Sequence, residues 1–394
     1  MSISFELGEE LQAVVEAVHA FAEGRLRPHL REFEAAGGLP AELEAECHEL
    51  GLTTLALPEA LGGNDLLDLR AAVLCSEELA WGDLGAAVAI PGPRTAAALV
   101  VELASQEQAA RLLAPFTAPD GGSRRGAAAL VEGPFGLDPT TIQTTARRDG
   151  DAWVLDGTKR YVQGAGQAEL TLVLARDTGS SAPDPWDRLG LFAVEGRPAG
   201  LSAGERHRML GLGTARFADL TLAGVRVPAA NRLGAGAPGE VGRALHRAVA
   251  RKKLLDAARL VGCCRAASEY AFKYATERKA FGVYLHEHQG LAFMMADMAT
   301  RTDGIRTLVW QAAWALDAGQ KDEGARLAFQ AFRQAADLAV LVTTDAVQVL
   351  GGHGYLHDHP VEKWMRDART LGLADGLTFD EEELLEATVS GTGN

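Results

Sequence analysis

A chain of 394 residues, of which 47% are hydrophobic, is long enough to form two or three domains with buried cores. The formal net charge of -15 argues against a surface that binds the phosphate backbone of nucleic acids over its whole extent. A local basic groove remains compatible with that charge, but we expect no nucleic acid among the partners.

The N-terminus and the cysteines are typical of a cytoplasmic protein. The first residues, MSISFELGEELQ, are acidic and amphipathic and lack the basic and apolar regions of a signal peptide. No run of about 18 uninterrupted apolar residues occurs, so we expect no membrane span. The four cysteines show no CxxC spacing, and the adjacent pair Cys263 and Cys264 cannot form an ordinary disulfide, which fits a reducing compartment.

Helical periodicity marks the first part of the chain. Apolar residues recur at helical spacing among acids and arginines over residues 8–36, and a second helical segment begins at Pro40 and ends at Gly51. A turn-rich segment, APDGGSRRG, follows near residue 117. These patterns predict an N-terminal helical domain of residues 1–116.

Short apolar or alternating runs fill the middle of the chain. Examples are AWVLDGTKRYVQ, LTLVLARD and LGLFAVEG, and turn sequences such as RDGD and GRPAG separate the runs. This pattern predicts a middle β domain of residues 117–236, built as a small barrel or sandwich.

Long helical runs with few breakers return from about residue 238. Three or four such runs with broad apolar faces predict a C-terminal four-helix bundle of residues 237–394. Helices, then strands, then helices indicate the α+β class and not an alternating parallel sheet. A dinucleotide site of the GxGxxG type is unsupported, because a strand pattern follows GLGTAR at residues 211–216.

The histidines do not predict a metal site. His286 and His288 form one group, and His353, His357 and His359 form another, but neither group has the helical HExxH spacing. Solvated loop histidines are the simpler interpretation, and we expect no bound metal.

Two polar segments are ambiguous on spacing alone. The run 277–279 is either a solvated helix face or, through the forked guanidinium of Arg278, a site for a diphosphate. The segment RDARTLGLADG ends with Asp375 before Gly376. This pair is common in turns, yet it also leaves a carboxylate available as a catalytic base.

Several segments together resemble the acyl-CoA dehydrogenase family. Their order and separations match the family across nearly the whole chain, and the last two are the most specific. The segments are GLTTLALPEALGGNDL (51–66), ALVEGPFGLD (129–138), DGDAWVLDGTKRYVQGA (149–165), VRVPAANRLG (225–234), ATERKAFGVYLHEHQGLAFMMADMA (275–299) and QVLGGHGYLHDHPVEKWMRDAR (348–369). The resemblance implies the same three-part fold and a homodimer or homotetramer, with FAD lying partly across a subunit interface.

The resemblance also implies which residues contact FAD. The residues implied to touch FAD bound mainly by a neighbouring subunit are Arg278, Phe281 and Gln289, and those implied on its adenine or ribityl side are Gln348, Gly351 and Gly352. Tyr161 takes the place of a tryptophan and is still able to stack on a flavin. These residue types suit the role, because a guanidinium offsets diphosphate charge and glycine lets the backbone approach closely.

Asp375 aligns with the glutamate that removes the α-proton of an acyl thioester in most members of the family. In some members that glutamate lies on the first bundle helix, where this chain has Lys252. Asp375 is therefore the candidate base. Aspartate is one methylene shorter than glutamate, and a retraction of roughly 1 Å is able to slow a reaction about a hundredfold.

The sequence departs from the family pattern around the flavin and the acyl group. Gln163 replaces a threonine, and Ala374 replaces the aromatic residue often found before the base. The first hypothesis is an acyl-CoA dehydrogenase-like oxidoreductase that acts on a thioester carried by CoA or by a carrier protein. The alternative is a non-catalytic or weakly catalytic subunit that forms a hetero-oligomer with an active paralogue. Chemistry like that of nitroalkane oxidases is a third reading.

Overall fold

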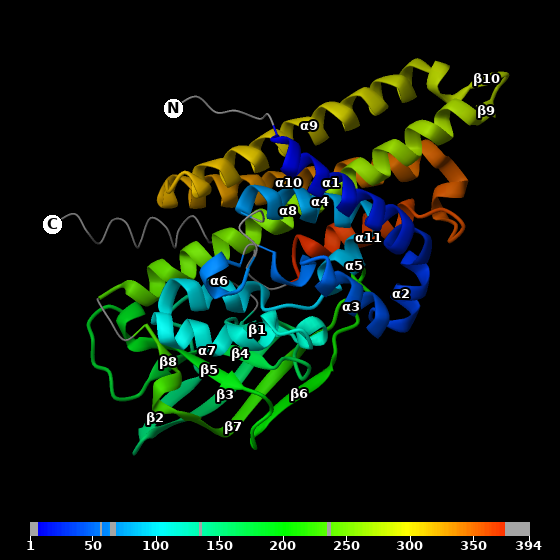
Figure 1. The fold of residues 1–394 in the computed structure, drawn as a ribbon. Coiled ribbons are helices and arrows are strands. Elements are labelled where there is room, and N and C mark those ends of the chain that lie inside the picture. Colours follow the sequence, from blue (N-terminus) through cyan, green and yellow to red (C-terminus); the bar gives the residue numbers. More distant parts are fainter. Residues whose placement is uncertain (1–6, 56, 64–67, 134–135, 235–237, 375–394) are drawn as a thin grey trace.

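The order of helices and strands follows the three patterns seen along the sequence. The computed structural model describes residues 7–55, 57–63, 68–133, 136–234 and 238–374. Within these residues, helices precede an eight-stranded sheet, and four more helices follow it. The sheet lies at one end of the molecule, and the long helices α8, α9 and α10 extend at the other (Figure 1). This arrangement confirms the predicted α+β class, with helical, β and helical parts in succession.

The N-terminal helices begin at residues suited to cap them. Asp68 and Asp83 each accept a hydrogen bond from the backbone N–H three residues later, at 2.8 and 2.9 Å. Ser105 and Gln108 form a capping box. The helices are α1 (Glu9–Phe21), α2 (Leu30–Ala36), α3 (Ala41–Glu49), α4 (Leu69–Gly82), α5 (Leu84–Ala89), α6 (Arg94–Leu103) and α7 (Gln106–Thr117).

The strands form one sheet in the order β6-β7-β3-β2-β4-β5-β8, and β1 pairs in parallel with β4. The strands are β1 (Gly126–Ala129), β2 (Thr145–Asp149), β3 (Ala152–Gln163), β4 (Leu170–Asp177), β5 (Leu189–Glu195), β6 (Leu201–Arg206), β7 (Phe217–Pro228) and β8 (Arg232–Leu233). Successive side chains along β4 point to opposite faces of the sheet. Leu172 and Leu174 belong to the main core shared with the helices, whereas Val173 and Ala175 belong to a smaller second core.

The C-terminal part is built from α8 (Glu240–Glu277), α9 (Gln289–Asp317), α10 (Lys321–Leu350) and α11 (Val361–Leu371). A hairpin of β9 (Lys279–Ala280) and β10 (Val283–Tyr284) connects α8 to α9. Gly262 allows α8 to pack closely on α4, because a Cβ atom at this position would lie 2.0 Å from the carbonyl oxygen of Glu77. The segment Lys321–Tyr355 is long and apolar enough to cross a membrane by length and composition. It nevertheless contains α10, which packs against α8, α9 and α11 as a core helix of the bundle.

Candidate active site

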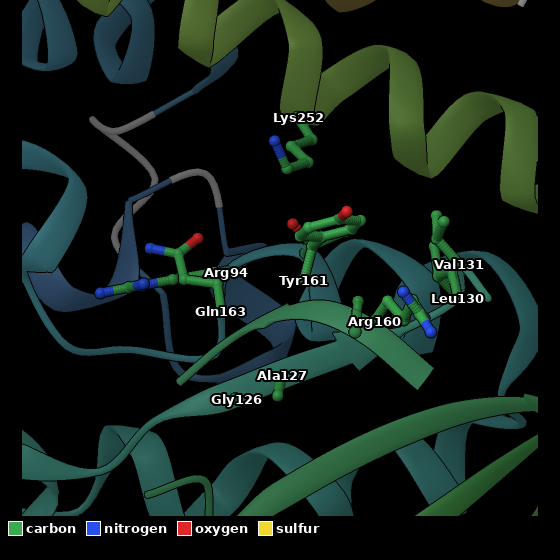
Figure 2. Close-up of a pocket in the computed structure, with 11 residues that line it drawn as sticks. Arg94, Gly126, Ala127, Leu130, Val131, Arg160, Tyr161, Gln163 and Lys252 are labelled. Atoms are coloured by element: carbon green, nitrogen blue, oxygen red, sulfur yellow. The ribbon is translucent and has the colours of Figure 1, made fainter. Parts of the chain in front are cut away.

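Two neighbouring cavities lie where the sheet meets the helices. The first, here called the sheet cavity, has a volume of about 40 Å³ and is bounded by β1, the end of β3, the start of α6 and α8 (Figure 2). The second, here called the helix cavity, has a volume of about 100 Å³ and lies between α4, α6 and α8. The cavities share four lining residues, which are Arg94, Thr95, Gln163 and Lys252. A ligand in one cavity would therefore adjoin a ligand in the other.

Tyr161 lines the sheet cavity, and an irregularity in the strand presents its ring there. The pairing of β3 with β7 shifts its register between Lys159 and Val162, and Tyr161 has a φ of 54°. A non-glycine residue in this region of backbone space is strained by about 1–2 kcal/mol. In Figure 2 the ring lies between the strand and the side chain of Lys252. The strained backbone thus places an aromatic face at the cavity, as strained residues often do at functional sites.

A buried ion pair holds the segment that follows β1 against the sheet cavity. The fully buried ammonium of Lys159 donates hydrogen bonds to the carbonyl of Leu130 at 3.1 Å and to Glu132 at 2.7 Å. Burial lowers the pKa of Lys159 to about 8, against the opposing effect of the Glu132 carboxylate. Burial works to raise the pKa of Glu132, but the charge and hydrogen bond of Lys159 lower it overall. The pair fixes Leu130 and Val131, which both line the sheet cavity.

Gln163 and Arg94 mark the boundary between the two cavities. The side-chain amide of Gln163 donates a hydrogen bond to the carbonyl of Val88 at 2.8 Å, which ties β3 to α5. Arg94 is the first residue of α6, has a φ of 47°, and donates a hydrogen bond from Nη2 to the carbonyl of Ile90. Burial, reinforced by the nearby guanidinium of Arg125, lowers the pKa of Arg94 to about 9. The Arg94 side chain therefore still carries its positive charge at neutral pH.

One face of α8 supplies a charged wall to the helix cavity. Lys252, Asp256 and Arg259 follow one another at helical spacing of four and three residues, so they share that face. The Asp256 carboxylate accepts hydrogen bonds from Lys252 at 2.5 Å and from Arg259 at 2.8 Å. Lys252 is therefore paired with a carboxylate of its own helix.

The structure divides the FAD residues implied by the resemblance into groups on different elements. Tyr161 lines the sheet cavity. Arg278 ends α8, Phe281 lies in the following hairpin, and Gln289 begins α9; all three are exposed. Phe281 is 99% exposed and has a φ of 55°. Figure 1 shows this hairpin at the far end of α8 and α9 from the sheet, so one chain does not bring it to the Tyr161 ring.

The remaining implied residues lie at the end of α10. Gln348 is exposed in its last turn, and Gly351 and Gly352 follow the helix. A Cβ atom at either glycine would meet nothing within 4 Å, so the backbone here is open to approach by another molecule. The candidate base, Asp375, lies outside the described residues, which end at the buried Ala374.

The cations of the helix cavity were missed from the sequence, apart from Lys252. Arg94 follows Pro93 at a helix start, and nothing in that local pattern indicates a cavity. The spacing of Lys252, Asp256 and Arg259 on one helix face was a usable signal, because charges on an apolar helix near a candidate site call for a partner.

Comparison with known proteins identifies the fold. Sequence models of the N-terminal, middle and C-terminal domains of acyl-CoA dehydrogenases match residues 8–120, 127–225 and 242–378. The chain belongs to the acyl-CoA dehydrogenase family. This confirms the resemblance seen in the sequence. Members of the family are FAD-dependent flavoprotein oxidoreductases that act on CH–CH donors.

Named relatives cover nearly the whole chain. It is 32% identical to cyclohexane-1-carbonyl-CoA dehydrogenase of Geobacter metallireducens, over 94% of this chain and 95% of the relative. It is also 32% identical to the mitochondrial short-chain specific acyl-CoA dehydrogenase of Sus scrofa, over 95% and 89%. The structure of butyryl-CoA dehydrogenase from Megasphaera elsdenii superposes with a TM-score of 0.86 at 29% identity, covering 99% of both chains.

Proposed function

We propose that this protein is a FAD-dependent dehydrogenase that introduces a double bond between the α and β carbons of an acyl thioester. The observation that carries the proposal is the pair of neighbouring cavities, which share four lining residues. One has an aromatic wall and backbone edges, as a flavin ring needs, and the other runs between helices, as an acyl chain needs. The thioester is carried by CoA or by a carrier protein, and the protein acts in the cytoplasm.

The residues of the sheet cavity fit a flavin ring. Tyr161 offers a ring face, and the small residues Gly126, Ala127 and Ala128 line the cavity beside it. The far part of FAD would be held by a second subunit of a homodimer or homotetramer. The residues proposed for that contact are Arg278, Phe281, Gln289, Gln348, Gly351 and Gly352. When bound, FAD supplies the acceptor for the β-hydrogen and its electron pair.

The side chains of this protein would bind the substrate and handle its α-proton. The apolar wall of the helix cavity, which includes Leu255 and Val101, shields the acyl chain from water. Asp375 would take the α-proton onto its carboxylate as the double bond forms. Lys252, bonded to Asp256 one turn along α8, would line the site beside the acyl chain.

The experiment is anaerobic bleaching of the flavin by a panel of acyl-CoAs, with wild type compared with Asp375→Asn. The substitution preserves size and removes basicity, so the variant should retain flavin and lose flavin reduction. Asp375→Glu extends the carboxylate by one methylene and tests whether the pocket is adapted to aspartate. Equal reduction rates for wild type and Asp375→Asn would show that Asp375 is not the base.

A second candidate function is a subunit that completes the FAD site of an active paralogue. The observation that favours it is that the exposed hairpin residues match the family pattern, whereas Gln163 and Ala374 depart from it near the flavin and the acyl group. Purified protein without flavin, and without bleaching by any thioester, would favour this reading over the dehydrogenase.

A further inference from the structure

The helix cavity carries more positive charge than an apolar acyl chain requires. Much of its wall is apolar, but four cationic side chains line it, and among the lining residues that the structure describes Asp256 supplies one carboxylate. The cations are Arg94, Arg251, Lys252 and Arg259. A neutral acyl chain in this cavity would form no favourable electrostatic interaction with these cationic side chains.

The acids near the cavity are already shared between cations. Asp256 accepts hydrogen bonds from both Lys252 and Arg259. Glu102 lies 3.9 Å from Arg251, but its closer partner is Arg247, at 2.6 Å. Among the described residues, Arg94 forms no ion pair, and its hydrogen bond is to the carbonyl of Ile90. An anion entering the cavity would therefore meet a guanidinium that no carboxylate in the described part of the chain contacts directly.

Two buried donors of the same cavity have no hydrogen-bond partner in the part of the chain that the structure describes. They are the hydroxyl of Ser76, on α4, and Nε of Arg259, on α8. Ser76 is 1% exposed, so water in bulk solution does not satisfy it. Buried polar groups are nearly always paired in native proteins. Orphan donors on two walls of one cavity point to an acceptor group on the ligand.

The backbone of Arg94 adds an independent observation. Of the four described non-glycine residues with positive φ, two, Arg94 and Tyr161, line these cavities. Strain of this kind persists only where the surrounding structure holds it, and it clusters at ligand sites. The α6 start thus holds a strained, charged side chain at the boundary between the proposed flavin and acyl positions.

We infer that the substrate is an acyl thioester whose acyl chain ends in a carboxylate, with Arg94 as the residue that determines this specificity. The inference rests on the proposed dehydrogenase function and adds the substrate class. The carboxylate accepts hydrogen bonds from the Arg94 guanidinium, with Ser76 and Arg259 as the further donors. A site built to bind a charged group rejects an analogue that lacks it, because its own buried donors then stay unpaired.

The test compares binding of carboxylate-ended and neutral thioesters of equal backbone length by titration calorimetry. Succinyl-, glutaryl- and adipoyl-CoA are matched with butyryl-, pentanoyl- and hexanoyl-CoA, so the CoA portion cancels in each affinity ratio. Wild type should bind at least one carboxylate-ended chain tenfold or more tightly than its neutral match. Arg94→Gln should reduce that ratio about tenfold to a hundredfold, the range expected for hydrogen bonds to charged groups.

The matched control is Arg243→Gln. It removes an exposed guanidinium of α8, the helix that also carries Arg259, outside both cavities, and it should leave the affinity ratio unchanged. Ser76→Ala removes a donor without a partner, so it should fold normally and lower the ratio severalfold. It keeps the inference testable if Arg94→Gln does not fold. Equal or tighter binding of the neutral chains by wild type, or an unchanged ratio in both cavity variants, overturns the inference.

Flavin bleaching with the same thioesters separates this inference from the proposed function. Bleaching by neutral chains with no preference for carboxylates would keep the dehydrogenase and reject the carboxylate site. Tight, Arg94-dependent binding of carboxylate-ended chains without any bleaching would support the anion site and reject the dehydrogenase.

Discussion

At the scale of single residues, a fully buried charge in the described part of the chain is matched by two charges of opposite sign. The fully buried Lys363 lies 2.5 Å from Asp83 and 2.7 Å from Asp367. Burial works to lower the pKa of Lys363, but the two carboxylates raise it overall. Lys159 has a single carboxylate partner, Glu132, and is correspondingly easier to destabilise.

Lys159→Met should lower the free energy of unfolding by about 1–3 kcal/mol, because the half-buried Glu132 loses its ammonium partner and keeps only its hydrogen bonds from the backbone. Urea unfolding of both proteins measures the difference. The double variant Lys159→Met with Glu132→Gln should recover part of the loss, since it removes the stranded charge. Equal stability of wild type and Lys159→Met would mean that the pair positions Leu130 without stabilising the fold.

His246 predicts a specific pH dependence of stability. Burial against Phe329 lowers the pKa of His246 from 6.5 to about 4, and its Nε2 has no partner among the described residues. Above pH 6.5 the ring is neutral in both states and its contribution is complete. As the pH falls from 6.5 to 4, the unfolded chain binds a proton that the folded protein does not bind, so the free energy of unfolding decreases by about 3 kcal/mol.

The measurement is the free energy of unfolding at several pH values between 7 and 4, for wild type and His246→Leu. The variant cannot titrate at this position, so its free energy of unfolding should fall less steeply between pH 6.5 and 4. Parallel curves for the two proteins would assign the acid sensitivity to other groups.

At the scale of elements, backbone contacts set how closely helices pack. The contact of α8 with α4 depends on the missing side chain of Gly262, as the 2.0 Å approach to the Glu77 carbonyl shows. The periodicity of the sequence predicted the helices on both sides of this contact. It did not predict their closeness, because a glycine inside a helical pattern has the same appearance whether it faces solvent or another backbone.

Gly262→Ala should therefore destabilise the protein by about 1–3 kcal/mol, as overpacking against backbone does. The matched control is Gly304→Ala in α9, where an added Cβ atom meets nothing within 4 Å. That change should stabilise the protein by about 0.5–1 kcal/mol through helix propensity. Thermal unfolding of the two variants should shift in opposite directions, and a shared direction would contradict the close contact.

At the scale of the whole molecule, the sequence predicted the succession of parts better than it predicted the site. Hydrophobic periodicity and turn residues are local features of a sequence, so the succession of helical, β and helical regions was correctly predicted. The domain boundaries at residues 116 and 236 stay predictions. Tyr161 was placed by resemblance, but its strained bulge depends on the pairing of β3 with β7. Tertiary packing brings Arg94, Ser76 and Arg259 to one cavity. No local sequence pattern predicts that they line the same cavity.

Arg278→Ala should lower the affinity for FAD by about 1.5–3 kcal/mol if the guanidinium binds a diphosphate held mainly by a neighbouring subunit. Because Arg278 is exposed, the fold should persist. Flavin content after purification measures the effect, with Lys273→Ala, an exposed cation of the same helix, as control. Unchanged flavin content in Arg278→Ala would show that Arg278 is a solvated residue at the end of the helix and does not bind FAD.

Helix α8 carries both the charged wall of the helix cavity and, at its end, Arg278. A rise of 1.5 Å per residue sets Lys252 and Arg278 about 40 Å apart along one rigid rod. Inserting or deleting a single residue between them would turn the hairpin by about 100° relative to the cavity. The number of residues between Lys252 and Arg278 is therefore fixed by the need to keep the direction of the hairpin relative to the cavity.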